Sequence, residues 1–342
     1  MKMSLVFLAA LFCSHAFSQN VQRIAFGSCS HQDKPQPIWS QVLGADPDLF
    51  IFLGDNIYGD SEDPAVLAAK YQKLASISGV AELRRQVPVI ATWDDHDYGK
   101  NDSGSEFVGK ESSRKVMLDF WGEPENSPRR TRSSGIYTSY YYGEKGKRVQ
   151  VLMLDLRWNR TELVELEDEQ RLQLRRSENR GPYDASLAAT ATLLGEDQWD
   201  WLEAELQVEA DVRIIASSIQ LLAEFTGWET WANYPKDRQR FFEMLEIYQQ
   251  EPILILSGDV HWSEYSEISE TANGWPLIEL TSSGLTEEWK AISPNRHRVG
   301  EAFAVANFGL IEIDWSENLP TLNLTIRDVS GEDLISKKIR FD

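Results

Sequence analysis

Cysteine is scarce in this chain of 342 residues, which contains only Cys13 and Cys29. Cys13 lies in an N-terminal segment that we predict to be removed, so Cys29 would be the only thiol of the mature protein. A single thiol excludes an intramolecular disulfide. Cys29 is then either a small buried side chain or a metal ligand, and neighbouring residues must distinguish the two.

Basic charge is also in short supply, because 34 Lys and Arg stand against 54 Asp and Glu, for a formal net charge of −20. Nucleic acids and anionic membranes are bound by basic surfaces, so this balance argues against both as partners. An anionic substrate would have to be held by cations concentrated at one place. The hydrophobic fraction of 42% is enough for a packed core and excludes a disordered chain.

Long hydrophobic runs are missing except near the N-terminus, where Leu5 to Phe12 follow Lys2 and precede Ala16-Phe17-Ser18. This order is typical of a secretory signal peptide, which we place at residues 1–18 with cleavage near Ser18–Gln19. The protein would therefore be secreted or periplasmic. No other run approaches the roughly 18 apolar residues of a spanning helix, so we expect no membrane span.

The rest of the chain alternates short apolar runs with helix-length polar segments, and no repeat or linker divides it. The expected strands are 23–28, 48–53, 87–92, 149–154, 212–217 and 252–256. The expected helices are 64–85, 112–121, 196–209 and 235–250. This alternation predicts a layered α/β fold in one domain, residues 19–342, with antiparallel strands at 304–314 and 321–328 extending the sheet.

Two polar segments do not fit the alternation and are expected to be insertions. Residues 122–148 are basic and rich in tyrosine, and residues 158–190 are highly charged. A charged run of the second kind is typical of a solvated surface helix with a loop.

Coordinating or charged side chains follow each expected strand. The sequences at these strand ends are Gly27-Ser28-Cys29, Gly54-Asp55-Asn56-Ile57-Tyr58, Trp93-Asp94-Asp95-His96-Asp97, Asp155-Leu156-Arg157, Ser217-Ser218 and Gly258-Asp259-Val260-His261. In open α/β sheets, ligands bind beyond the carboxyl ends of the strands, where these residues would converge.

Each motif alone also has an ordinary structural explanation. Gly-Asp after a strand is a common turn, the cluster at Asp94–Asp97 could cap a helix, and Arg157 could form a surface salt bridge. Together the motifs explain one another, because carboxylates crowded around one imidazole repel each other unless a cation is present.

The donor types predict two unlike metals. Cys29, Tyr58 and His261 with Asp55 suit iron, ferric because two donors are strongly donating anions. Asp95, Asp259 and a shared Asp55 form an all-oxygen site for Ca²⁺, Mg²⁺ or Mn²⁺.

Such a pair of metals would bridge a water, lower its pKa and clamp an in-line displacement at phosphorus. Arg157 would bind phosphate oxygens, and His96 would donate a proton to the leaving oxygen or stabilise its charge. Within the same motifs we group Asp97 with the catalytic residues and Asn56 with those that bind the substrate phosphate.

The motifs as a set resemble the alkaline phosphatase D family, a branch of the calcineurin-like metallophosphoesterases. They are FGSCS (26–30), GDNIYGD (54–60), WDDHDYGKND (93–102), LDLR (154–157), LLGEDQWDWLEAEL (193–206) and GDVHW (258–262), in order from about residue 23 to 265. The resemblance implies an α/β/β/α sandwich of mixed sheets flanked by helices, with the active site at the strand C-terminal ends. It also implies a phosphoesterase with ferric iron and calcium.

Position by position, the resemblance implies Cys29, Asp55, Tyr58 and His261 as iron ligands. It implies Asp95 and Asp259 as calcium ligands and Arg157 as the phosphate-binding arginine. The wider superfamily often has nitrogen donors at the second site, and their absence here favours a hard cation. Asp94 and Asn101 remain alternatives to Asp95 as ligands of that second metal.

The leading hypothesis is a bimetal phosphoesterase of small phosphate esters. The alternative is a phosphodiesterase or phospholipase D-like enzyme with the same metal centre. A third, less favoured hypothesis is a non-catalytic metal-binding protein that retains the fold. The natural substrate and the oligomeric state stay open.

Overall fold

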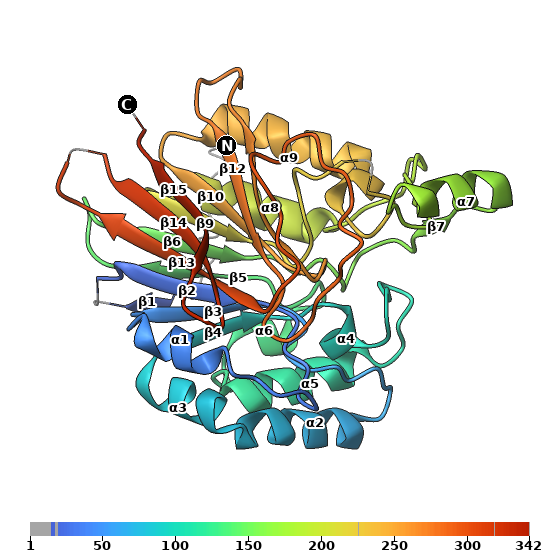
Figure 1. Cartoon of the computed structure of the whole chain (residues 1–342), viewed down its shortest axis with the longest axis horizontal. Helices are drawn as coiled ribbons and strands as arrows, with labels where there is room; N and C mark the ends of the chain where they lie inside the picture. The colour runs from blue at the N-terminus through green and yellow to red at the C-terminus, as the bar shows by residue number, and fades with distance from the viewer. Residues whose placement is uncertain (1–14, 18–19, 225, 318, 342) are drawn as a thin grey trace, which may run out of the picture.

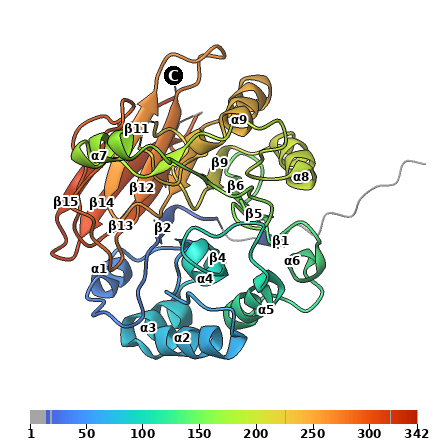
Figure 2. The same cartoon turned by 90° about the vertical axis from the view of Figure 1, so that its right-hand side faces the viewer.

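Two β-sheets lie face to face in the computed structural model, which describes residues 15–17, 20–224, 226–317 and 319–341. Helices cover the outer surface of each sheet, so the layers run helix, sheet, sheet, helix (Figures 1 and 2). This is the α/β/β/α sandwich predicted from the sequence.

The first sheet has the strand order β15-β14-β13-β2-β3-β4. Its parallel half contains the apolar strands β2 (Arg23–Gly27), β3 (Leu49–Leu53) and β4 (Val89–Thr92). Its antiparallel half contains β13 (Asn307–Asp314), β14 (Thr321–Asp328) and β15 (Asp333–Ile339). The C-terminal strands therefore extend the sheet through β13, which pairs with β2, as the alternating sequence predicts.

The second sheet has the order β1-β5-β6-β9-β10-β12-β11. Its parallel centre is β6 (Val149–Met153), β9 (Val212–Ala216) and β10 (Ile253–Ser257). The flanking strands are β1 (His15–Phe17), β5 (Thr138–Tyr142), β11 (Ser263–Ile268) and β12 (Leu277–Ser282). Both parallel centres consist of buried apolar runs, because each is covered on its two faces.

Three layers of apolar side chains hold the sandwich together. The central layer joins the sheets through residues such as Ile24, Leu49, Val151 and Ile214. The layer outside the first sheet packs α1 (Trp39–Gly44), α2 (Pro64–Ser76), α3 (Ser78–Gln86) and α5 (Lys110–Trp121). The layer outside the second packs α8 (Glu196–Leu206) and α9 (Pro235–Tyr248), on the opposite side of the molecule (Figure 1).

The expected helix 64–85 is two helices. Ile77 has extended backbone angles (φ −69°, ψ 120°) and separates α2 from α3. A Cβ atom at Gly79 would lie 2.3 Å from Cβ of Trp39. The chain therefore turns at Ile77 so that α3 can pack closely against α1 at a position where only glycine fits.

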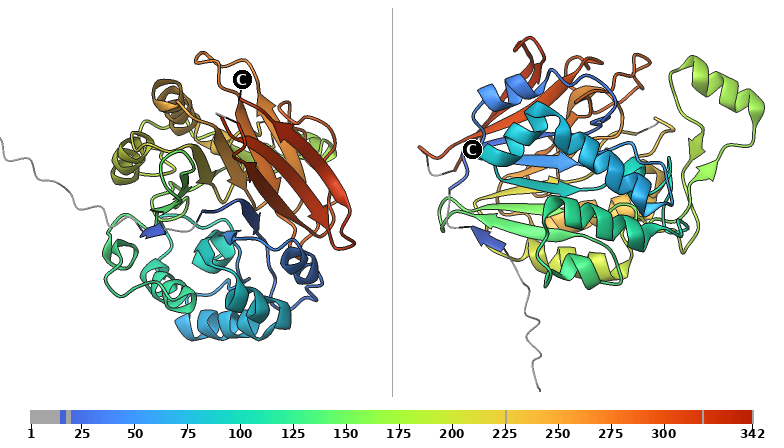
Figure 3. Two further views of the ribbon diagram at one scale, coloured as in Figure 1. Left: turned by 90° about the vertical axis from the view of Figure 1, so that its left-hand side faces the viewer. Right: turned by 90° about the horizontal axis from the view of Figure 1, so that it is seen from below.

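The two expected insertions differ in structure. Within residues 122–148, a short helix α6 (Pro128–Thr131) is followed by β5, which is a sheet strand rather than a loop. Residues 158–190 begin with the buried Trp158 and Arg160, and residues 164–184 form a projecting segment that we call the arm (Figure 3). It carries β7 (Val164–Glu165), β8 (Tyr183–Asp184) and α7 (Glu169–Ser177), a helix with no buried residue.

Most of the expected signal peptide, residues 1–14 and 18, lies outside the described residues. The described part forms β1, which pairs in parallel with β5 (Figure 3). None of the described helices combines the length and apolar character needed to cross a bilayer.

Arg129 fastens α6 to the first sheet, and we expect its loss to destabilise the protein strongly. Its guanidinium is buried, donates to the carbonyls of Ala91 (2.7 Å) and Ile136 (2.8 Å), and pairs with Glu123 at 2.9 Å. Arg129→Ala would remove two buried hydrogen bonds to backbone carbonyls and one partner of a buried ion pair, a loss that typically costs about 3–5 kcal/mol.

Urea denaturation would measure this loss as a lower free energy of unfolding. The control is Arg85→Ala, which removes an exposed ion pair with Glu82 (2.5 Å) and should cost at most about 1 kcal/mol. Equal effects of the two substitutions would contradict the assigned role of Arg129.

Candidate metal centre

The loops after the parallel strands bring the predicted donors to one place between the two sheets. Several donors have backbone angles that side chains other than glycine rarely adopt, with φ of 62° at Cys29, 49° at Asp55, 70° at Asp259 and 62° at His261. Left-handed backbone at non-glycine residues carries a cost and concentrates at functional sites. The chain thus turns sharply where each strand ends and aims these side chains inward.

The first donor group consists of Cys29, Asp55 and His261, whose ligand atoms lie within 4.8 Å of one another. The Cys29 Sγ atom is 3.5 Å from Oδ2 of Asp55. Tyr58 joins the group through its hydroxyl, 3.0 Å from Nε2 of His261. All four predicted iron ligands therefore meet in one cluster.

Burial sets the protonation of this group in the absence of a cation. It raises the pKa of the Cys29 thiol to about 12 and lowers the pKa of His261 to about 4. It also raises the pKa of Tyr58 well above its usual value. A neutral imidazole can bind a metal directly, whereas the thiol and phenol would have to lose their protons to solvent when a cation binds.

The second donor group consists of Asp94, Asp95 and Asp259, again within 4.8 Å of one another. Asp55 also lies within that distance of Asp95 and His96, so it stands between the two groups. Burial and the neighbouring carboxylates raise the pKa of Asp55 and Asp259 well above the usual range. This repulsion is the strain that a bound cation would remove.

Orphaned oxygens show that these residues fit a metal. Oδ2 of Asp94 and Oδ1 of Asp95 are fully buried and have no hydrogen-bond partner among the described residues. Buried carboxylate oxygens normally have hydrogen-bond partners. A donor group made only of carboxylate oxygens suits a hard divalent cation. Both Asp94 and Asp95 belong to this group, so the structure keeps both as candidate ligands.

Arg157 lies completely buried beside the second donor group. Its Nε donates to Oδ1 of Asp94 at 2.6 Å and its Nη1 to Glu229 at 2.8 Å. Burial alone would raise the pKa of Asp95, but the charges of Arg157 and His96 outweigh it and lower that pKa to about 2. Arg157 is therefore an internal cation of the site and not a surface salt bridge.

His96 connects the metal donors to the solvent side. Its backbone N–H donates to Oδ1 of Asp55 at 3.3 Å, and its Nδ1 lies 2.7 Å from Oδ1 of Asp60. The ring packs on Tyr58 with centroids 4.2 Å apart. Burial lowers its pKa, but the carboxylates of Asp95 and Asp60 reverse this and raise it to about 9. His96 can thus carry a proton at neutral pH.

Asp97 and Asn56, which the sequence analysis assigns to catalysis and phosphate binding, lie behind the donors. The Asp97 carboxylate caps the short helix α4 (Asp95–Tyr98), accepting from the backbone N–H groups of Asp94 (2.7 Å) and Asn56 (3.1 Å). The Asn56 amide donates to the carbonyl of Thr92 at 2.8 Å. Asp97 is the third residue of α4, and at that position a carboxylate can turn back toward the helix N-terminus. Its side chain therefore forms part of a capping box with Asp94.

A cavity of about 190 Å³ opens beside the donors. Predicted site residues on its wall are Asp95, His96, Asn101, Asp259 and His261, and Trp262 of the GDVHW motif also lines it. Sequence reasoning missed Asp102, Trp228, Glu229 and Trp289, which also line it. Trp228 and Trp289 meet edge to face with centroids 6.0 Å apart and form one rim. Asn101 reaches the cavity and so stays an alternative ligand.

None of the missed residues directly follows the end of a strand, as the predicted donors do. Glu229 belongs to residues 226–230, between β9 and the short 3-10 helix η1 (Trp231–Asn233). Asp102 follows α4, and its backbone N–H donates to Oδ2 of Asp95 at 2.7 Å. The available signal was the Asp and Glu content of these polar segments, which is too common to single them out.

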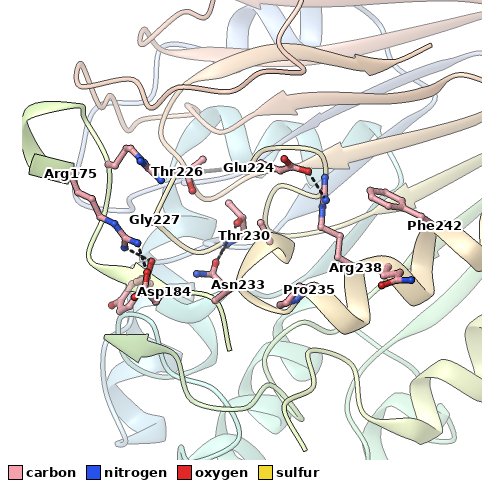
Figure 4. A pocket seen from close by; sticks show the side chains of 15 residues that line it. Arg175, Asp184, Glu224, Thr226, Gly227, Thr230, Asn233, Pro235, Arg238 and Phe242 are labelled. Atoms are coloured by element: carbon pink, nitrogen blue, oxygen red, sulfur yellow. Dashed lines mark hydrogen bonds and ion pairs between the residues drawn. The ribbon is translucent and has the colours of Figure 1, made fainter. Parts of the chain in front are cut away.

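A second cavity of about 430 Å³ lies on the other side of residues 226–230, between the arm and α9 (Figure 4). Its wall includes Arg175, which pairs with Asp184, and Arg238, which pairs with Glu224 at 2.8 Å. These cations are satisfied by carboxylates within the cavity wall. Residues 226–230 therefore form a partition with the metal donors on one side and paired charges on the other.

The sequence from residue 24 to residue 307 matches the family model described as PhoD-like phosphatase. A search of curated protein sequences gives no significant match. Among solved structures, one of PhoD has a TM-score of 0.65 at 17% identity and covers 96% of this chain and 74% of its own.

Two further solved structures have the same fold. GAP50 from the inner membrane complex of Plasmodium has a TM-score of 0.57 at 12% identity, over 95% of this chain and 90% of its own. A dimetal phosphatase from Danio rerio has a TM-score of 0.54 at 15% identity, over 95% of this chain and 100% of its own. At such identities the likeness concerns the arrangement of strands and helices alone.

Proposed function

The chain belongs to the PhoD-like phosphatase family, and we propose a bimetal phosphoesterase of small phosphate esters that its N-terminal sequence would direct to secretion or to the periplasm. The family confirms the resemblance predicted from the motifs and makes the protein a metal-dependent phosphoester hydrolase. The observation that carries the finer proposal is the position of Asp55, which lies between a donor group with sulfur and nitrogen and a donor group of carboxylates.

We assign Fe³⁺ to Cys29, Asp55, Tyr58 and His261, because thiolate and phenolate donors stabilise a ferric ion. We assign Ca²⁺, with Mg²⁺ or Mn²⁺ as alternatives, to the carboxylates of Asp95 and Asp259 with Asp55, and Asp94 is placed to complete the set. When bound, the two metals supply the activation of the attacking water and the neutralisation of phosphate charge.

Two residues of the chain complete the proposed reaction. Arg157 would bind phosphate through Nη2, the end of its guanidinium that makes no hydrogen bond to the described residues. His96, held by Asp60 at the cavity wall, would give its proton to the leaving alcohol oxygen. Asp97 and Asn56 would act by fixing α4 and the loop after β3.

The direct test is hydrolysis by the purified protein loaded with iron and calcium, followed as phosphate released from a panel of monoesters. We expect turnover that chelation abolishes and metal restores. A folded, metal-loaded protein that hydrolyses no ester would instead favour the non-catalytic metal-binding hypothesis.

A phosphodiesterase is a second candidate function, because the metal-site cavity adjoins a wider cleft. Asn101 and Asp102 line both the cavity and a cleft of about 500 Å³ that runs along the arm past Glu165. This cleft gives room for the second alcohol of a diester. Comparing kcat/KM for matched mono- and diesters on the same preparation would separate the two activities.

Tyr58→Phe is expected to remove a visible absorption band from the iron-loaded protein. A phenolate bound to ferric iron gives a charge-transfer band, and phenylalanine keeps the ring packing on His96 while removing the oxygen. Absorption spectroscopy with iron content measured in parallel checks this. Tyr71→Phe serves as the control, since Tyr71 is buried in the same region but bonds to Asp97. A band that persists in Tyr58→Phe would rule out Tyr58 as a ferric ligand.

A further inference from the structure

Glu229 holds two buried arginines at the metal site. Its side chain is 3% exposed, accepts from Nη1 of Arg157 at 2.8 Å and lies 3.3 Å from Nη2 of Arg160. Both arginines are completely buried. A buried carboxylate between two buried guanidiniums is fixed in place, because moving it would leave unpaired charge in the interior.

Arg157 is consequently held along two edges of its guanidinium, and the third edge has no hydrogen-bond partner among the described residues. Asp94 accepts from Nε at 2.6 Å, and Glu229 accepts from Nη1. Nη2 makes no hydrogen bond within the described ranges and lies 3.8 Å from Oδ1 of Asp95. Without Glu229, the guanidinium could turn about its Nε–Asp94 bond and close onto Asp95.

The arm keeps Glu229 in position. The N–H groups of Gly181 and Tyr183 donate to the carbonyls of Thr226 and Gly227, each at 2.8 Å. A Cβ atom at Gly227, where φ is +71°, would lie 2.5 Å from the Gly181 carbonyl oxygen, so the two backbones touch. The arm is thus bonded to the same five residues that carry Glu229.

We propose that Glu229 is a positioning residue that holds the Arg157 guanidinium with Nη2 toward the substrate phosphate. This inference rests on the proposed function, in which Arg157 binds phosphate. The competing role is that of a metal ligand, because carboxylate atoms of Glu229, Asp95 and Asp102 lie within 4.8 Å of one another. The two roles predict different metal contents for the same variant.

The test compares Glu229→Gln with Glu224→Gln in the full-length, metal-loaded protein. Glu224 precedes the same partition and is also paired with an arginine, Arg238, but faces the second cavity (Figure 4). We expect Glu229→Gln to lower kcat/KM and the affinity for inorganic phosphate by about 10–100-fold, the usual effect of a group that orients a functional side chain. Metal content should be unchanged, and Glu224→Gln should match the wild type in both measurements.

A double-mutant cycle with Arg157→Ala separates positioning from a general structural role. If Glu229 acts through Arg157, adding Glu229→Gln to Arg157→Ala should change phosphate affinity and kcat/KM less than about threefold. The proposal would be overturned if Glu229→Gln lowered phosphate affinity and kcat/KM by about 10–100-fold in the Arg157→Ala variant as well. Tighter phosphate binding or loss of metal in Glu229→Gln would also overturn it. Should Glu229→Gln not fold, Glu229→Asp keeps the charge and is expected to give a smaller loss that also vanishes without Arg157.

Measuring phosphate binding distinguishes a failure of the Glu229 inference from a failure of the proposed function. Absence of turnover in the wild type would contradict the phosphoesterase, whereas calorimetry with inorganic phosphate would still report whether Glu229 acts on Arg157. Turnover in the wild type with unchanged phosphate affinity in Glu229→Gln would contradict the inference alone.

Discussion

Asp55→Asn is expected to lower kcat/KM by a factor on the order of 10³ or more while leaving the protein folded. Residues that merely orient a metal ligand cost about 10–100-fold when they are replaced. Asp55 lies within ligand distance of both donor groups, so its loss would affect two sites at once. Asparagine keeps the shape of the side chain but replaces one carboxylate oxygen by an amide NH2 and removes the negative charge, so the main expected effect is on metal binding.

The backbone should tolerate this change. Asp55 has a φ of 49°, and asparagine is among the few residues that adopt left-handed angles readily. Asp46→Asn is a matched control, because Asp46 has a φ of 50° but is exposed and pairs only loosely with Arg23 (3.6 Å). We expect Asp46→Asn to be fully active. Steady-state kinetics with metal analysis checks both variants, and substantial activity in Asp55→Asn would contradict a shared ligand.

The sequence predicts the layered α/β fold and the donors for the same physical reason. Fully buried parallel strands must be apolar, so β3 and β10 stand out as runs such as Leu49–Leu53, and polar residues directly after them mark the strand ends. Cys29, Asp55 and Asp259 lie just after the ends of β2, β3 and β10, respectively. The local sequence therefore identifies those site residues that directly follow a strand.

The direction in which a side chain points, and its contacts with residues distant in the sequence, are harder to predict. Asp95 and Asp97 stand in one motif, yet the turn of α4 sends the first to the donors and the second back to cap the helix. Glu229 acts through Arg157, a partner 72 residues away, and no pattern within residues 226–230 encodes that pairing. β5 is hidden in a tyrosine-rich stretch because its place in the sheet comes from pairing with β6. Such features depend on tertiary packing.

Removal of the metals is expected to lower the thermal stability of the protein markedly. The site gathers buried carboxylates from Asp55, Asp94, Asp95 and Asp259, and burial with mutual repulsion raises the pKa of Asp55 and Asp259 well above normal. A cation that binds only the folded state adds about 4 kcal/mol at a thousandfold excess over its Kd. For a chain of this size, that corresponds to a fall in Tm of roughly 5–10 °C after chelation.

Differential scanning calorimetry before and after dialysis against EDTA would measure this fall, and adding iron and calcium back should restore the Tm. The size of the fall should depend on the carboxylates themselves. In Asp55→Asn one buried charge is gone, so the metal-free protein suffers less repulsion and the bound metals contribute less. We therefore expect a smaller chelation effect in Asp55→Asn than in Asp46→Asn, which should behave as the wild type. An equal fall in the two variants would mean that the stabilising cation binds away from Asp55, and the assignment of the shared ligand would have to be abandoned.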